Sequence, residues 1–203
     1  AGCLSQRYPD ELATEMPEVD HFLGSSDMLK LGAVLRREAK ERMLVGNPAE
    51  YTMRATDPRQ LTQRGHSAYV KIAEGCSQRC SFCIIPRLRG GQKSRMIEDV
   101  VEEVRELTKV GVREINLIAQ DLTHYGDDLK DGSSLTDLLR ELVKIDGVHW
   151  FRLLYAYPHQ FTDELIDLIA TEEKIASYVD MPLQHIADPM LQRMRRRFSE
   201  ADT

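Results

Sequence analysis

The sequence has few cysteines, few aromatic residues and no long hydrophobic run. Four cysteines in 203 residues are too few for a disulfide scaffold. No apolar stretch approaches the roughly 18 residues that a membrane-spanning helix needs, and no charged-then-apolar leader opens the chain. These absences predict a soluble protein of the cell interior, which we expect to be cytoplasmic and to have no membrane partner.

The composition is that of a globular protein. Hydrophobic residues make up 42% and charged residues 30% of the chain, which argues against disorder. The net charge of −6 also argues against a general nucleic-acid coat protein, because such a protein needs a broad basic face. The length suits one domain, or one domain with part of another.

Residues 1–41 contain short α/β elements. A helix is predicted to begin at Pro9, a strand to cover residues 19–24, and a second helix to be capped by Ser25 or Ser26. These elements are too few for a complete sheet. We therefore interpret this stretch as part of a domain.

The rest of the chain divides into a connector and a longer α/β region. Residues 42–66 lose hydrophobic periodicity and contain Gly46, Pro48 and Pro58, which predicts a connector. From residue 67 to residue 203, strands alternate with helices. The second region is therefore the main candidate for a functional domain.

Residues 67–203 contain a series of predicted strand–helix units. Strands are expected at 68–72, 114–118, 150–155 and 177–181, and helices at 97–110, after Ser133 or Ser134, after Thr162, and from Asp188. Strand–helix units in series imply a parallel sheet, because parallel neighbours need a crossover connection. The predicted fold class is α/β, with either a partial (β/α) barrel or an open doubly wound sheet.

Unusual residues follow each predicted strand. The four loops cover residues 75–83, 119–121, 157–159 and 182–185. Because the carboxyl ends of parallel strands share one rim, we expect these loops to meet there and to form the functional site.

Three cysteines stand close together in the first of these loops. Cys76, Cys80 and Cys83 have the spacing C-x-x-x-C-x-x-C. Three thiolates can hold three irons of a 4Fe–4S cube and leave the fourth iron free to be chelated by a small molecule. A structural zinc site would need a fourth ligand, for which His66 is the nearest donor. Three inert structural thiols are the remaining alternative.

This spacing, placed after the first strand and with the aromatic Phe82 before the last cysteine, resembles the radical S-adenosylmethionine (SAM) enzymes. The resemblance implies a reduced 4Fe–4S cluster that passes one electron to bound SAM, and an external electron donor. It also implies that Phe82 forms an apolar wall near the adenine and that Gln120 helps to hold the cofactor.

Two further stretches narrow the resemblance to the methylthiotransferases. Residues 84–95 resemble the segment after the cluster in that family, and residues 2–8 with 18–24 resemble the end of its N-terminal domain. The resemblance implies a second 4Fe–4S cluster in the full-length protein, with Cys3 as one ligand. It predicts a partial (β/α) barrel of radical SAM type, preceded by a fragment of the N-terminal domain. We also expect that the family's chain continues beyond both ends of this sequence.

Two substrates are compatible with this family. One subfamily modifies the β-carbon of an aspartate in the twelfth protein of the small ribosomal subunit, and the other modifies an adenosine in transfer RNA. Residues 116–121, Tyr125 with Gly126, and residues 153–159 and 178–185 resemble the ribosomal-protein group. We favour that substrate, with transfer RNA, an inactive cluster-binding fragment and a zinc-stabilised binding module as alternatives.

Two basic runs do not separate these substrates. The first comprises Arg87, Arg89, Lys93 and Arg95, and the second comprises Arg193, Arg195, Arg196 and Arg197. Either run could meet phosphate, and the second is equally compatible with a solvated helix face.

Overall fold

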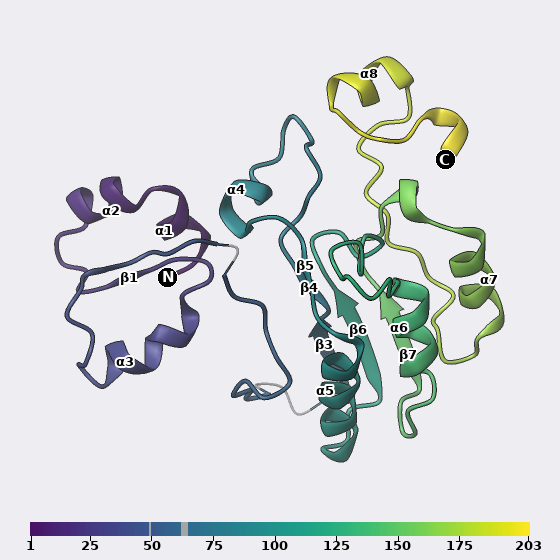
Figure 1. Cartoon of the computed structure of the whole chain (residues 1–203), viewed down its shortest axis with the longest axis horizontal. Coiled ribbons are helices and arrows are strands. Elements are labelled where there is room, and N and C mark those ends of the chain that lie inside the picture. The colour runs from purple at the N-terminus through teal and green to yellow at the C-terminus, as the bar shows by residue number, and fades with distance from the viewer. Residues whose placement is uncertain (49, 62–64) are drawn as a thin grey trace.

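Three parallel strands form the centre of the structure, in the order β3-β6-β7 (Figure 1). They are β3 (Ser67–Lys71), β6 (Glu114–Ile118) and β7 (Trp150–Leu153). The structure is a computed structural model and describes residues 1–48, 50–61 and 65–203. The predicted α/β class with a parallel sheet is confirmed, and the described residues form no closed barrel.

The two faces of the sheet differ in polarity. Ala68, Val70 and Leu153 are buried, as the alternation of a half-covered strand requires. The parallel register places Tyr69 beside Asn116, and Asn116 beside Arg152, in one row on the other face. The sheet therefore has one apolar face for a core and one face that carries polar and aromatic side chains.

Helices α5 (Ile97–Lys109), α6 (Leu135–Leu142) and α7 (Asp163–Thr171) pack against the apolar face (Figure 1). The predicted caps of α6 and α7 are confirmed. Ser134 and Asp137 form a reciprocal capping box at α6, and Thr162 Oγ1 accepts a hydrogen bond from the backbone N–H of Leu165.

The main core lies between these helices and the sheet. Its fully buried side chains on the helices include Val100, Val104, Leu138, Leu139 and Leu142. Burial of each such side chain contributes about 1.5–3 kcal/mol to the free energy of folding. The helical spacing of these residues follows directly from the sequence pattern, and so do the positions of the helices.

The predicted fourth strand over residues 177–181 does not form. Among the residues that the structure describes, one isolated bridge continues the sheet, between Phe151 and Ile175. Tyr155 has a φ of 70°, which turns the chain out of the extended conformation directly after β7. Its backbone N–H then donates to the carboxylate of Asp180 instead of a ladder carbonyl, at 3.0 Å. The segment therefore runs beside β7 without extending the ladder.

The N-terminal unit contains a second, very short parallel sheet. Its elements are α1 (Cys3–Arg7), α2 (Pro9–Glu15), β1 (Phe22–Leu23), the 3-10 helix η1 (Met28–Lys30), α3 (Leu31–Leu35) and β2 (Met43–Leu44). Strands β1 and β2 pair with each other. Strand β2 lies within the stretch that the sequence indicated as a connector.

The predicted cap of the helix after β1 is wrong. Asp27 precedes η1, and neither Ser25 nor Ser26 caps it. Ser25 Oγ instead donates to the carbonyl of Leu88 at 2.6 Å, and Ser26 Oγ donates to the carbonyl of Pro48. Leu88 lies in α4 (Ile85–Arg89), so Ser25 links the N-terminal unit to the sheet domain.

Residues 75–92, here called the cysteine loop, connect the two strands of a small antiparallel pair. This pair consists of β4 (Ala73–Glu74) and β5 (Lys93–Ser94), and α4 lies within the loop. Gly75 has a φ of 78°, and a Cβ atom at this position would lie 2.3 Å from the carbonyl oxygen of Gly91. The loop therefore closes on itself at a position where only glycine fits.

A buried arginine organises the region where the chain enters α5. The Arg95 side chain is 1% exposed and forms ion pairs with Asp99 and Glu103. Its Nη1 donates to the carbonyl of Lys71, and its own carbonyl accepts from Tyr125 Oη. Loss of this arginine would remove one of the two cations that pair with the buried Glu103 carboxylate, the other being Arg59, so the group is a structural one.

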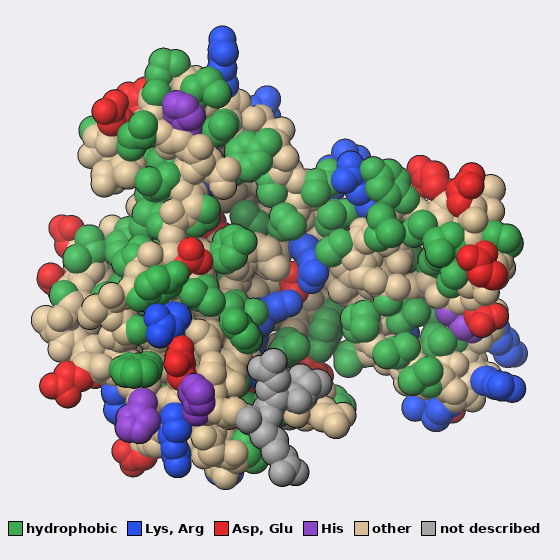
Figure 2. Space-filling model, turned by 180° about the vertical axis from the view of Figure 1, so that it is seen from behind, with side chains coloured by type: hydrophobic (Ala, Val, Ile, Leu, Met, Phe, Trp, Pro, Cys, Tyr) green, Lys and Arg blue, Asp and Glu red, His purple; other side chains and the backbone are tan. Residues whose placement is uncertain are grey.

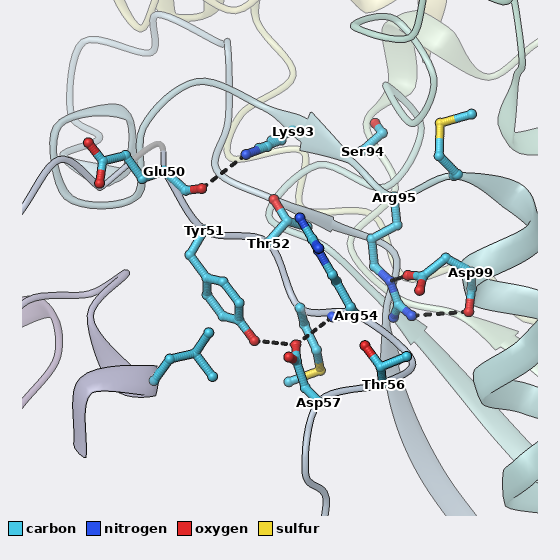
Figure 3. Close-up of a pocket in the computed structure, with 13 residues that line it drawn as sticks. Glu50, Tyr51, Thr52, Arg54, Thr56, Asp57, Lys93, Ser94, Arg95 and Asp99 are labelled. Atoms are coloured by element: carbon cyan, nitrogen blue, oxygen red, sulfur yellow. Dashed lines mark hydrogen bonds and ion pairs between the residues drawn. The ribbon is translucent and has the colours of Figure 1, made fainter. Parts of the chain in front are cut away.

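Residues 50–57 lie against this region and enclose a cavity of about 610 Å³ (Figure 3). Asp57 accepts hydrogen bonds from Tyr51 Oη and from the backbone N–H of Arg54, while Asp99 accepts from the backbone N–H of Ala55. Figure 2 shows, from behind, a hollow between the N-terminal unit and the rest of the molecule, with Lys and Arg side chains inside it.

The C-terminal part carries a small second core. Tyr157, Leu191 and Phe198 are buried against one another. Around them lie η2 (Pro158–Gln160), α8 (Asp188–Arg193) and η3 (Glu200–Asp202). Helix α8 has Pro189 in its first turn, as predicted. None of the helices in the described ranges combines the length and the hydropathy needed to cross a bilayer.

We expect Gly75→Ala to destabilise the protein by about 3 kcal/mol, because it adds a steric clash to an unfavourable φ. Gly111→Ala is the matched control, since Gly111 also has a positive φ (96°) but no atom lies within 4 Å of the position that a Cβ atom would take. This control should cost about 1 kcal/mol. Urea unfolding measures both changes, and an equal loss in the two variants would contradict the proposed close approach.

Candidate functional site

A cavity of about 550 Å³ opens where the parallel strands end. The four loops that follow the predicted strands all contribute to its lining, as expected from the chain order. The lining residues at this position include Cys76, Gln78, Cys80, Phe82, Cys83, Ala119, Gln120, Asp121, Tyr155, Tyr157, Pro182, Gln184 and Arg196.

Three free thiols share this cavity. Cys76, Cys80 and Cys83 all line it, and none forms a disulfide. The backbone N–H of Gln78 donates to Cys76 Sγ at 3.4 Å. Burial raises the pKa of the Cys76 thiol to about 11, so this sulfur needs a nearby cationic centre to become a thiolate.

The three thiols of the cavity match the number of protein ligands that a 4Fe–4S cluster with one open iron needs. Within the described ranges, no three His, Cys, Asp or Glu side chains are arranged to hold one metal ion. His66, the donor considered for zinc, lies directly before β3, where its carbonyl accepts the N–H groups of Arg113 and Glu114. The cysteines follow the opposite end of that strand, because the cysteine loop begins after β4.

The two residues expected to hold the cofactor also line the cavity. The Phe82 side chain is 54% exposed and adds an aromatic surface next to Cys83. Gln120 Oε1 is buried and accepts no hydrogen bond from any described residue. A buried acceptor without a partner needs a donor to offset its desolvation, and in this cavity a bound ligand can supply that donor.

A buried network of polar side chains connects the loops that line the cavity. The sequence pattern does not predict this network. The carboxylate of Asp121 lies 2.8 Å from His124 Nδ1 and accepts a hydrogen bond from Gln78 Nε2 at 3.1 Å. Thr123 Oγ1 donates to the carbonyl of Tyr157. These contacts tie the cysteine loop to the loops after β6 and β7.

Arg196 is a further cavity residue that the sequence did not single out. It belongs to the second basic run, in which its neighbours Arg195 and Arg197 are exposed, whereas Arg196 is half-buried. A run of consecutive arginines carries no periodic signal that distinguishes the inward residue. Only the packing of the C-terminal part selects it.

Cys3 lies apart from this cavity, on α1 in the N-terminal unit. Its Sγ accepts a hydrogen bond from Arg89 Nε at 3.2 Å, and Arg89 Nη1 pairs with Glu74. Arg89 ends α4, within the cysteine loop. Cys3 therefore contacts the loop that carries the other three cysteines, but from the side of the N-terminal unit.

Two histidines of the predicted rim are not part of the cavity lining. His159 and His185 are exposed, and His185 Nδ1 accepts a hydrogen bond from the backbone N–H of Ala187. The two histidines lie in the predicted loops at residues 157–159 and 182–185, but their side chains do not reach the cavity that the thiols line.

Comparison with known proteins gives sequence relatives over almost the whole chain. It is 60% identical over 202 residues to the ribosomal protein uS12 methylthiotransferase RimO of Sorangium cellulosum, covering 97% of this chain and 41% of that protein. The RimO protein of Myxococcus xanthus is 53% identical, with 96% and 40% covered. The chain thus spans less than half of the length of these curated relatives.

Solved structures share the fold at low sequence identity. The cobalamin-dependent S-adenosylmethionine radical enzyme OxsB superposes over 99% of this chain and 33% of its own, with a TM-score of 0.65 and 14% identity. The radical S-adenosylmethionine methyltransferase TsrM from Kitasatospora setae gives a TM-score of 0.55 at 21% identity, over 78% of this chain and 32% of its own.

A family model settles the wider membership. The model of the Radical SAM superfamily matches residues 70–203, which contain the carboxyl end of β3, the cysteine loop and all the strand ends around the cavity. The match, the sequence relatives and the shared fold agree with the arrangement of thiols described above. The chain therefore belongs to the Radical SAM superfamily.

Proposed function

We propose that this chain provides the cluster-binding part of a methylthiotransferase that modifies an aspartate of ribosomal protein uS12. The observation that carries the proposal is the cavity itself, in which three free thiols lie beside an unpartnered buried amide oxygen. The names of the relatives from Sorangium cellulosum and Myxococcus xanthus support the choice of reaction and substrate.

Cys76, Cys80 and Cys83 are the proposed ligands of a 4Fe–4S cluster. Three thiolates leave one iron without a protein ligand, and the remaining cavity volume is available for SAM. When bound, the cluster and SAM supply the one-electron chemistry that removes a hydrogen atom from an unactivated carbon. An external electron donor is required for that step.

Other side chains of the cavity bind and orient the cofactor in this proposal. Phe82 presents an apolar face that suits the adenine ring. Gln120 Oε1 accepts a hydrogen bond from the cofactor, which removes the cost of its burial without a partner. The Gln78–Asp121 hydrogen bond holds the cysteine loop in place while these contacts form.

Cys3 is the proposed ligand of a second 4Fe–4S cluster, with the other ligands supplied from outside this chain. Its Sγ accepts a hydrogen bond from Arg89 Nε, so a guanidinium lies directly beside the sulfur. The contact between α1 and α4 keeps this position close to the cysteine loop. We also propose that the radical SAM domain begins near residue 67, which the start of the family match at residue 70 supports.

The choice of radical chemistry follows from the substrate. The β-hydrogens of an aspartate side chain are too weakly acidic for removal by an ordinary protein base near neutral pH. Because uS12 is a component of the ribosome, we place this activity in the cytoplasm.

Cys80→Ala tests the cluster assignment. After anaerobic reconstitution with iron and sulfide, we expect this variant to lose most of the iron, the labile sulfide and the visible absorption of the cavity cluster, because one of its three ligands is gone. Cys3→Ala is the matched control, since it removes a thiol outside the cavity and should retain this cluster. Equal iron and sulfide in Cys80→Ala and the unaltered chain would refute the assignment.

Gln120→Leu tests the proposed contact with the cofactor. Loss of one hydrogen bond should weaken the binding of SAM to the reconstituted chain about fivefold, as measured by anaerobic calorimetry. Gln192→Leu makes the same chemical change at an exposed position of α8 and should leave the affinity unaltered. Equal affinity in the two variants would remove Gln120 from the proposed site.

The substrate is tested by supplying uS12 and transfer RNA separately to the reconstituted chain with SAM and a reductant. We expect mass spectrometry to detect a methylthio group in place of one hydrogen on the uS12 aspartate. Modification of transfer RNA alone would replace the proposed substrate. Cluster assembly without modification of either would support the cluster-binding role and contradict an independent activity of this chain.

A further inference from the structure

Arg196 makes a direct contact with one of the cavity thiols. Its Nη1 donates to Cys80 Sγ at 3.5 Å, although the two residues are 116 positions apart in the chain. The other arginines of the run, Arg193, Arg195 and Arg197, are exposed. The sulfur contact is therefore specific to one member of the basic run.

Several contacts hold the guanidinium in this position. Nη2 donates to the carbonyl of Pro182 at 2.6 Å. The guanidinium carbon lies 4.3 Å from the centre of the Tyr157 ring and 5.2 Å from that of Phe198. The Tyr157 ring is itself fixed, because its hydroxyl accepts the backbone N–H of Arg197. Much of the conformational entropy of the Arg196 side chain is therefore already lost before any ligand binds.

The positive charge of Arg196 has no carboxylate partner among the described residues. No ion pair joins it to an Asp or Glu side chain in those ranges, and its Nε is buried without an acceptor. A partly buried guanidinium that is placed only for packing would be expected to pair with a carboxylate. Here the hydrogen-bond acceptor that can carry a negative charge is the sulfur of Cys80.

We infer that Arg196 is a positioning residue that raises the reduction potential of the cluster bound at Cys80. This inference rests on the proposed function, because it requires the cluster. A hydrogen bond to a ligand sulfur and a nearby positive charge both stabilise the more negative, reduced form of a cluster. The C-terminal part of the chain thus acts on the redox chemistry of the cavity through one side chain.

Arg196→Gln tests this role, because it removes both the positive charge and the guanidinium N–H groups that donate to Cys80 and Pro182. The midpoint potential of the reconstituted cluster is measured by a redox titration that is followed by electron paramagnetic resonance (EPR), without SAM. At the midpoint potential of the unaltered chain, we expect the ratio of reduced to oxidised cluster to fall about tenfold in this variant. Arg197→Gln changes the charge equally at an exposed position and should leave the potential unaltered.

A second measurement detects the contact directly in the unaltered chain and uses substitutions only to assign the signal. The chain is prepared with arginine labelled with nitrogen-15 in the guanidinium group, and the reduced cluster is studied by pulsed EPR. We expect a weak hyperfine coupling from this nitrogen, which disappears in Arg196→Lys and persists in Arg79→Lys, where the exposed arginine lies within the cysteine loop.

The outcomes separate the inference from the proposed function. An intact cluster without the nitrogen coupling, or with the same potential in Arg196→Gln and the unaltered chain, overturns the inference alone. If the unaltered chain binds no cluster at all, the proposed function fails and the inference fails with it. A lower potential in Arg196→Gln, together with the coupling, supports the role of Arg196.

Discussion

The parallel pairing of β3, β6 and β7 is the constraint on which the site depends. Because the three strands run in one direction, the segments that leave them emerge at the same edge of the sheet. The cysteine loop, the loop that carries Gln120 and the segment around Tyr157 meet there for this reason. If one strand were reversed, its loop would lie at the opposite edge and the cavity would lose one wall.

The common edge of the sheet brings the loops together but does not fix the thiols. Contacts within and between the loops hold the thiols in place. Gly75 lets the cysteine loop fold back on Gly91, and the Gln78–Asp121 hydrogen bond ties that loop to the next one. Arg95 fixes the return of the chain into α5. These groups are costly to bury singly and are satisfied together, so the cysteine loop has little freedom to adopt another conformation.

Sequence periodicity predicted α5, α6, α7 and the three strands of the main sheet because burial on one face repeats with the period of the element. It failed at residues 177–181, where an apolar and aromatic run looks like a strand but Asp180 takes the hydrogen bond of Tyr155. It also failed at Ser25 and Ser26, whose hydroxyls donate to distant carbonyls instead of capping the next helix. Both errors arise from contacts between segments that local patterns do not encode.

The sequence by itself determined the positions of the thiols, the order of strands and helices, and the edge at which the loops emerge. These properties depend on spacing and on the fixed geometry of parallel strands. The tertiary structure alone decided that Arg196 faces Cys80 while its neighbours face solvent, and that Cys3 contacts Arg89 outside the cavity. The reason is that the relative orientation of segments far apart in the chain is set by packing, and packing depends on all of them at once.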